Sequence, residues 1–320
     1  MIPYHFHLVW MGSEFHFANR LAVESLLHTN PDAPITVHCQ DPPRHNRDWD
    51  ALSSRVEIRR MEEKQLIEQF STDRKNKREL LTAYRAVADS YPAGKSNVLR
   101  YLILHREGGI YIDFDTITVK DFRPLLSHKG FAGEEAVFRC DDDRVSGKAG
   151  LSLIPFGALF GLSYYGSFLN CRFLGDSAFW NRCNRLLMNL WSKKKLNNAV
   201  LACEPGNSFF HEALRAVPGT DPGIRFSLGP MLVNGIWDRS TEPALTRLSS
   251  NHFYLIPPSQ TFRFFHGPPV ALPRETYALH WCSSNHKKLV PRLSREWLLK
   301  RTGRPAFIQE LARPVIKAMD

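Results

Sequence analysis

Two aspartates separated by one residue follow a short apolar segment of the chain. Asp113 and Asp115 come directly after Ile110–Ile112, which we predict to be a buried strand. Because strand side chains alternate between faces, both carboxylates point to one side. Two adjacent carboxylates repel each other unless a positive group lies between them, and their oxygens suit Mg²⁺ or Mn²⁺. Such an ion can bridge to a diphosphate leaving group. Taken alone, the pattern equally fits two solvated turn aspartates.

The elements that must position these aspartates alternate between strand and helix. We predict strands over 3–10, 34–39 and 56–58, a helix over 17–29, one or two charged surface helices within 61–91, and a helix capped by Ser96 that ends at Gly108-Gly109. In the second half we predict strands near 131–139, 151–169 and 252–256, a helix at about 177–193, and a strand leading into His280. This order predicts an α/β fold with a largely parallel central sheet.

The segment from Gly150 to Leu169 has no charged residue and is long enough to be weighed as a membrane span. Pro155 and four glycines within it favour buried strand or loop backbone near a ligand instead.

Composition places the chain among ordinary globular proteins. Of 320 residues, 43% are hydrophobic and 23% are charged, which is typical of a folded domain and not of a disordered chain. The six cysteines form no Cys-x-x-Cys pair, and no secretory signal precedes the first strand. These features predict reduced thiols and a cytoplasmic location.

The formal net charge of +10 is concentrated near the end of the chain. Nine Lys or Arg residues lie between Lys287 and Lys317, opposed only by Glu296 and Glu310. A solvated helical face explains this segment, and peripheral contact with anionic lipid at the inner membrane surface is the alternative that we keep. Nucleic acid is a less favoured partner.

Three segments carry a resemblance to a known family. Residues 96–115 read SNVLRYLILHREGGIYIDFD and resemble the sugar-binding region of the Asp-x-Asp glycosyltransferases. That family includes outer-chain mannosyltransferases, α-1,4-galactosyltransferases, capsular polysaccharide transferases and the large clostridial glucosylating toxins. Ile2–Gly12 resembles the opening Ile-Pro…Trp-x-Gly of the family, and Tyr277–Trp281 resembles its His-Trp element. A further short match is Gly229-Pro230, which resembles the Gly-Pro that the family has before a helix.

The resemblance implies roles for individual residues. Asp113, Asp115 and His280 are expected to bind the Mn²⁺ or Mg²⁺ ion, and Asp113, Asp115 and Arg100 to act in catalysis. Trp10 is expected to stack on the nucleotide base. The other expected donor contacts are Gln40, Asp41, Asn97, Arg100, Tyr111, Asn170, Ser283, Ser284, His286 and Lys287. For Trp10 a core position, and for His280 a hydrogen-bonded strand end, remain as alternatives.

One position departs from the family pattern. Asn97 stands where the family usually has Asp, three residues before Arg100. An amide donates as well as accepts hydrogen bonds, so a different sugar, such as an acetamido sugar, or an inactive site would each explain the change.

The implied fold is the GT-A type of nucleotide-diphospho-sugar transferases, a mixed central sheet with helical additions. We expect a nucleotide-sugar half over 1–125 with a helical insertion at about 61–95, an acceptor half over 126–290, and a basic helical segment over 291–320. The expected activity is metal-dependent, retaining transfer from a UDP-sugar, or less often a GDP-sugar, to a glycan or lipid-linked saccharide, as in polysaccharide biosynthesis. The alternatives are a secreted bacterial effector that glycosylates protein, and a non-catalytic module that binds sugar nucleotide, nucleic acid or membrane.

Overall fold

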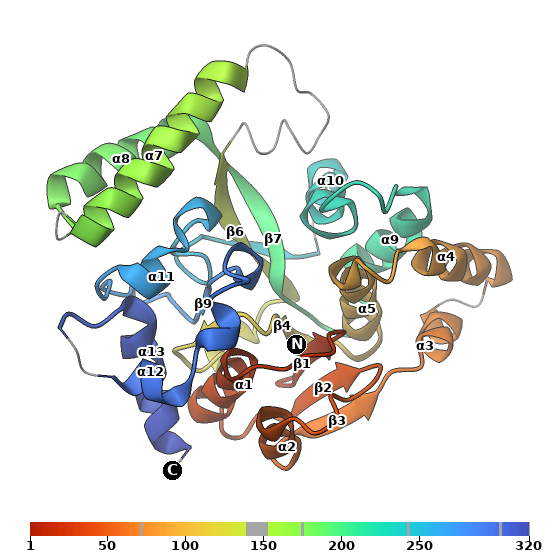
Figure 1. Cartoon of the computed structure of the whole chain (residues 1–320). Coiled ribbons are helices and arrows are strands. Elements are labelled where there is room, and N and C mark those ends of the chain that lie inside the picture. Colours follow the sequence, from red (N-terminus) through yellow and green to blue (C-terminus); the bar gives the residue numbers. More distant parts are fainter. Residues whose placement is uncertain (71–72, 139–152, 174–175, 242–243, 301–302, 320) are drawn as a thin grey trace.

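The computed structural model describes residues 1–70, 73–138, 153–173, 176–241, 244–300 and 303–319 (Figure 1). Its strands are β1 Phe6–Trp10, β2 Ile35–Cys39, β3 Glu57–Arg60, β4 Gly109–Ile112, β5 Thr116–Thr118, β6 Gly130–Phe138, β7 Ser192–Cys203, β8 Thr246–Leu248 and β9 Ala278–His280. Its α-helices are α1 Phe17–Thr29, α2 Arg47–Ser53, α3 Glu63–Phe70, α4 Arg74–Ala86, α5 Pro92–Glu107, α7 Leu153–Phe173, α8 Ala178–Trp191, α9 Ser208–Ala216, α10 Leu232–Arg239, α11 Arg263–His266, α12 Arg295–Leu299 and α13 Phe307–Ala318.

A seven-stranded sheet in the order β3-β2-β1-β4-β7-β6-β8 forms the centre of the molecule. Strands β3, β2, β1 and β4 are parallel, whereas β7 runs antiparallel to both β4 and β6. A separate pair, β5 and β9, joins the chain after Asp115 to the chain before Trp281. The predicted largely parallel sheet is therefore confirmed for its first four strands, and the sheet as a whole is mixed.

Helices cover both faces of this sheet. Buried side chains of α5, α9 and α10 form one core with the face of the sheet that carries Val9, Tyr111 and Leu201. The opposite face, which carries Phe6, Leu8 and Ile110, packs against α1 and α2. A third core lies between α1, α11, α12 and α13, so the basic C-terminal segment is partly built into the domain.

The junction between α5 and β4 delivers the chain to the aspartates. Gly108 and Gly109 have φ angles of +66° and +86°, which disfavour any residue with a Cβ. A Cβ at Gly109 would also lie 2.6 Å from the carbonyl oxygen of His5. The glycines therefore stop the helix and turn it into the sheet, as predicted. The predicted start was wrong, because α5 begins at Pro92 and Ser96 lies within it.

The second half differs most from the sequence-based expectation. Residues 151–169 were predicted as a strand, but the chain from Leu153 to Phe173 is helical. No strand occurs at 252–256, where the chain turns. The central strand β7 was not predicted, and three lysines at its start obscure its pattern. Among the helices that the structure describes, none combines the length and hydropathy that a membrane-spanning segment needs.

Two buried histidines make the stability of the fold depend on pH. His7 and His38 lie side by side on β1 and β2, with 3.1 Å between Nδ1 of His7 and Nε2 of His38. Burial lowers the pKa of His38 to about 3 and holds the pKa of His7 well below its ordinary value. The neutral pair therefore makes its full contribution to the stability of the fold above the unfolded-state pKa near 6.5. This contribution is lost progressively as the pH falls below that value.

Acidification from about pH 8 to about pH 5 should therefore cost about 2 kcal/mol of unfolding free energy per histidine. Replacing His38 with Gln keeps a hydrogen-bonding side chain and removes one titrating group. Urea denaturation followed by circular dichroism at both pH values should show a smaller pH dependence for His38→Gln than for the wild type. Equal pH dependence in the two proteins would contradict this explanation.

Candidate active site

Asp113 and Asp115 lie at the carboxyl ends of the parallel strands β1 and β4. The backbone amide of Asp113 continues the ladder by donating to the carbonyl of Ala199 on β7, at 2.9 Å. Phe114 lies between the aspartates in sequence and is buried against the opposite core. Both carboxylates consequently face the same side, as the alternation of strand side chains predicts.

Two residues of neighbouring elements hold Asp113. The hydroxyl of Tyr111, two residues earlier on β4, donates to Oδ1 at 2.6 Å. Nη2 of Arg100 on α5 lies 3.2 Å from the same oxygen, and the guanidinium also lies 4.3 Å from the centre of the Tyr111 ring. Arg100 is buried, so its charge is compensated mainly by this one carboxylate.

Asp115 is held by residues from the far end of the chain. Its Oδ1 lies 3.1 Å from Nε2 of His280 at the end of β9, and its Oδ2 accepts from the backbone amide of Ser283 at 2.8 Å. These contacts follow from the β5–β9 pairing, in which Thr116 lies opposite His280. The structure therefore brings together Asp113, Asp115 and His280, the three residues predicted as metal ligands.

The two carboxylates have different electrostatic surroundings. Burial raises the pKa of Asp113, and the charge of Asp115 raises it further against the opposing effect of Arg100. Burial would also raise the pKa of Asp115, but His280 and the Ser283 amide outweigh it and lower the pKa to about 2. Asp115 raises the pKa of His280 well above its ordinary value despite burial. A positive imidazole thus balances the charge of Asp115.

The donor set fits a divalent cation. One ligand atom from each of Asp113, Asp115 and His280 lies within 4.8 Å of the others. Two carboxylates and an imidazole suit Mn²⁺, and the carboxylates also suit Mg²⁺. A cation bound there would take over the charge compensation that protonated His280 provides.

Trp10 ends β1 beside the aspartates. Its ring packs edge-to-face against Phe114 at 5.2 Å and Phe15 at 4.9 Å, which fixes its plane while leaving it partly exposed. Gln40 and Asp41 follow the neighbouring strand β2 at the same edge of the sheet and are exposed. Asp41 forms an ion pair with Arg60 at 3.1 Å.

Residues 18–132 match the sequence model of a family described as a glycosyltransferase sugar-binding region containing a DXD motif. The matched segment contains Arg100, Tyr111 and both aspartates. Over these residues the chain is similar to that family. The seven-stranded mixed sheet with helices on both faces confirms the expected α/β fold.

Solved structures similar to this chain are distant in sequence. They include the PaToxG glycosyltransferase (18% identity, 73% of this chain and 68% of that chain, TM-score 0.44) and the UDP-bound glycosyltransferase domain of the YGT toxin (11%, 77% and 79%, 0.39). The galactosyltransferase LgtC in complex with donor and acceptor sugar analogues is also similar (12%, 98% and 95%, 0.39). No curated protein matches the sequence.

The position that departs from the family pattern lies in a buried group of amides. Asn97 accepts a hydrogen bond from Nδ2 of Asn198 on β7, at 2.7 Å. A Cβ at Gly229 would lie 2.8 Å from Nδ2 of Asn97, so the Gly229-Pro230 turn before α10 presses against the same amide. Asn97 is one helical turn from Arg100, and its amide contacts β7 while Arg100 contacts Asp113.

The remaining predicted donor contacts lie on two segments. Ser283, Ser284, His286 and Lys287 follow β9 directly; Ser283 binds Asp115, and Nε2 of His286 lies 2.9 Å from the hydroxyl of Thr261. Burial lowers the pKa of His286 to about 4, so it is neutral near pH 7. Asn170 lies near the end of α7, where it binds Ser177 and Asn181. These contacts join α7 to α8. Asn170 therefore lies on a different element from those that hold the aspartates.

Sequence reasoning missed Asn198 and Glu135. Glu135 on β6 is buried, accepts from Asn197 at 2.6 Å, and has a pKa raised by burial that His280 partly offsets. Both residues flank the site from β6 and β7. An asparagine pair inside an apolar strand, Asn197-Asn198 before Ala199, was the signal that could have revealed this side of the site.

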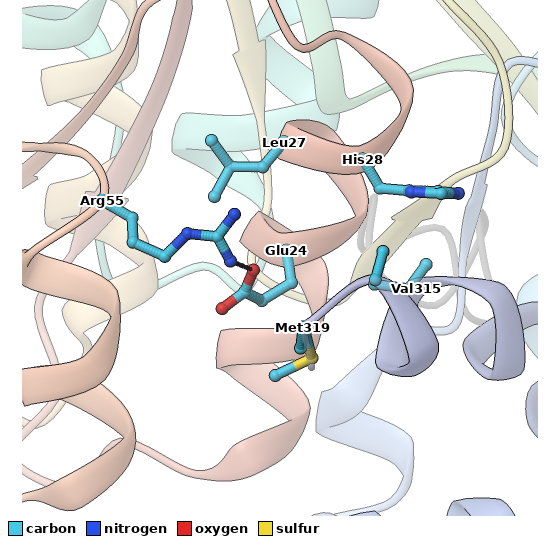
Figure 2. Close-up of a pocket in the computed structure, with 7 residues that line it drawn as sticks. Glu24, Leu27, His28, Arg55, Val315 and Met319 are labelled. Carbon is cyan, nitrogen blue, oxygen red and sulfur yellow. Dashed lines mark hydrogen bonds and ion pairs between the residues drawn. The ribbon is translucent and has the colours of Figure 1, made fainter.

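Two cavities of the protein lie away from the aspartates. One, of about 190 Å³, is lined by residues of α1 and α13 together with Arg55, and Figure 2 shows Arg55 reaching Glu24 across it. The buried Glu24 also pairs with Arg20 at 3.2 Å. Its charge is therefore compensated within the fold, which indicates a structural role. The other cavity lies between α1, α2 and residues 291–296.

Proposed function

We propose that the protein is a metal-dependent glycosyltransferase that takes a sugar from a nucleotide-sugar donor. The observation that supports this most strongly is the convergence of Asp113, Asp115 and His280 within 4.8 Å at the carboxyl ends of β1 and β4. Open α/β sheets bind ligands at this edge. The match to a glycosyltransferase family over residues 18–132 supports sugar transfer as the reaction at this site.

In this proposal Asp115 and His280 bind the ion, and Asp113 completes the site while Arg100 and Tyr111 orient it. A bound divalent cation neutralises charge on the departing nucleoside diphosphate. The segment from Ser283 to Lys287 supplies hydroxyl, imidazole and ammonium groups for the diphosphate oxygens. In this proposal Arg100, which pairs with Asp113, and Asn97, one helical turn away on α5, contact the transferred sugar.

We further propose UDP as the preferred nucleotide, with Trp10 stacked on its base. Replacing Trp10 with Ala should weaken UDP binding about tenfold, the size of one base–aromatic contact. Replacing it with Phe keeps an aromatic face and should restore most of the affinity. Isothermal titration calorimetry with UDP and Mn²⁺ measures both. Unchanged affinity in Trp10→Ala would place Trp10 in a purely structural role.

The acceptor that we propose is a glycan or lipid-linked saccharide, and the anomeric configuration is proposed to be retained. A ¹H NMR spectrum of the product reports this directly, because the coupling constant of the new anomeric proton distinguishes retention from inversion. Inversion would reject the retaining mechanism and leave the transfer itself intact.

The test of the function is a hydrolysis screen. Purified protein with Mn²⁺ is incubated with a panel of UDP- and GDP-sugars, and released nucleoside diphosphate is measured with and without EDTA. EDTA-sensitive release from one donor supports the proposal and names the sugar. Where no donor is hydrolysed, calorimetry with UDP and GDP decides, since a site that binds neither nucleotide in the presence of Mn²⁺ contradicts it.

A further inference from the structure

Helices α7 and α8 form a hairpin that projects from the domain between β6 and β7 (green, upper left in Figure 1). One side of it is anchored to the domain. Phe262 packs against Tyr164 at 5.3 Å and Phe168 at 5.5 Å, and Arg263 forms an ion pair with Asp176 at 2.9 Å. The hairpin therefore has a defined inner side that faces the domain and an outer side that faces away from it.

The outer side of the hairpin is apolar. On α7 the exposed large apolar side chains recur at helical spacing, at Leu162, Tyr165, Leu169 and Phe173. On α8 they are Phe179, Leu186 and Leu190. Phe179, Phe173 and Tyr165 are 74%, 70% and 67% exposed, values that aromatic side chains of a water-facing helix rarely have. Seven of the eleven exposed large apolar side chains in the described part of the chain lie on these two helices.

The contact between the two helices has the opposite character. Ser163 hydrogen-bonds Asn184 across it, and Asn170 binds Asn181 at 3.2 Å, with both Ser163 and Asn170 buried. A Cβ at Gly166 would lie 2.2 Å from the Trp180 ring, so the small residue allows close approach. Small and polar residues between helices with apolar residues outside is the arrangement of helices packed in lipid, and the reverse of helices packed in water.

The charge of the hairpin favours an anionic lipid over a neutral one. Helices α7 and α8 contain three arginines and no Asp, Glu or Lys. Arg172 and Arg182 are exposed beside the apolar residues. An apolar face with flanking cations suits an anionic bilayer surface, where aromatic rings enter the headgroup region and arginines reach the phosphates. A protein partner would have to supply an apolar surface that is also acidic.

We propose that the α7–α8 hairpin is a membrane-docking element that inserts its outer face into the surface of an anionic phospholipid bilayer. The hairpin packs on residues 262–263, and Thr261 next to them binds His286 of the segment that follows β9. Docking would thus place the candidate active site close to the bilayer surface. On the proposed function, this favours an acceptor carried on a lipid.

The proposal is tested with sucrose-loaded vesicles of phosphatidylcholine alone or mixed with phosphatidylglycerol, using sedimentation of the full-length protein. The wild type should bind the mixed vesicles. The variant Tyr165→Ser/Phe173→Ser/Phe179→Ser should bind at least about a hundredfold more weakly, because three rings no longer leave water. The variant Arg172→Gln/Arg182→Gln should lose about fivefold per arginine, and this loss should vanish on phosphatidylcholine alone.

Two controls separate this surface from others. Ile224→Ser/Leu272→Ser removes exposed apolar side chains outside the hairpin and should leave binding unchanged. Arg292→Gln/Lys300→Gln/Lys317→Gln reduces the charge of the basic C-terminal segment at exposed positions and should have a smaller effect than the triple serine variant. The thermal midpoint of each variant, measured without vesicles, should stay at the wild-type value because every replaced side chain is exposed.

Absence of wild-type binding to the mixed vesicles overturns the proposal, as does equal binding by the triple serine variant. A wild-type dimer in sedimentation velocity that the triple serine variant dissociates would assign the outer face to a second copy of the chain and also overturn it. Vesicle binding needs no donor or acceptor. A failure of the proposed function therefore leaves this result unaffected, and a failure here leaves the hydrolysis screen unaffected.

Discussion

Replacement of Asp115 with Asn should lower metal-dependent hydrolysis of the donor sugar about a thousandfold. Asn has the same shape and still accepts a hydrogen bond from the Ser283 amide, so the local backbone is preserved. It lacks the negative charge that both a divalent cation and the neighbouring His280 require. The measurement is the initial rate of nucleoside diphosphate release at saturating Mn²⁺, combined with electron paramagnetic resonance of free Mn²⁺ to count bound ions.

The matched control is Asp50→Asn, which makes the same chemical change at an exposed position on α2. It should keep the wild-type rate and the wild-type Mn²⁺ stoichiometry. If Asp115→Asn retained more than about a tenth of the rate while remaining folded, the aspartate would not be a ligand that the reaction needs.

Replacement of Arg100 with Met should lower the free energy of unfolding by about 3 kcal/mol. Arg100 is 4% exposed, and its loss leaves the partly buried Asp113 without its ion pair. Met has a similar length and keeps the packing against Tyr111, so the cost arises from the unpaired carboxylate and not from a cavity. Urea denaturation at pH 7 measures the change, and Arg100→Lys should recover only part of it because a single ammonium cannot reproduce the fork of contacts.

A double-mutant cycle isolates the ion pair. Asp113→Asn removes the charge that Arg100→Met leaves unpaired, so the double variant should lose less stability than the sum of the two single variants. Arg85→Met, at an exposed position of α4, should change stability by no more than about 0.5 kcal/mol. Strict additivity of Arg100→Met and Asp113→Asn would show that the two side chains do not depend on each other.

Local patterns predicted the first half of the fold well. Helix α1 and strand β2 were predicted correctly because their apolar residues recur at a clear spacing. Asn30 ends α1 before β2, and Gly108 ends α5 before β4. Asp113 and Asp115 were found for the same reason, since the alternation of side chains on β4 is a local property. The partnership of Asp115 with His280 depends on a β5–β9 pairing that no local pattern shows, and only the family resemblance suggested it.

The second half was predicted less well because small residues in α7 and polar residues in β7 obscured their secondary structure. Helix α7 contains Pro155 and three glycines, which normally weaken helices in water. These residues suggested strand or loop, yet small residues are what a closely packed helix pair needs. Strand β7 begins with three lysines and contains two asparagines because it faces the site, so its composition hides a strand at the centre of the sheet.

The bond from the Ser283 amide to Asp115 spans 168 residues of chain. During synthesis from the N-terminus, β4 and both aspartates therefore leave the ribosome long before His280 and Ser283 exist to balance them. Until then Asp115 lacks both of the groups that lower its pKa. A nascent chain ending near residue 132, although it contains all of the family's matched region, would hold only Asp113 and Asp115 of the three candidate metal ligands. Completion of the site thus belongs to the last stage of folding, when β9 pairs with β5.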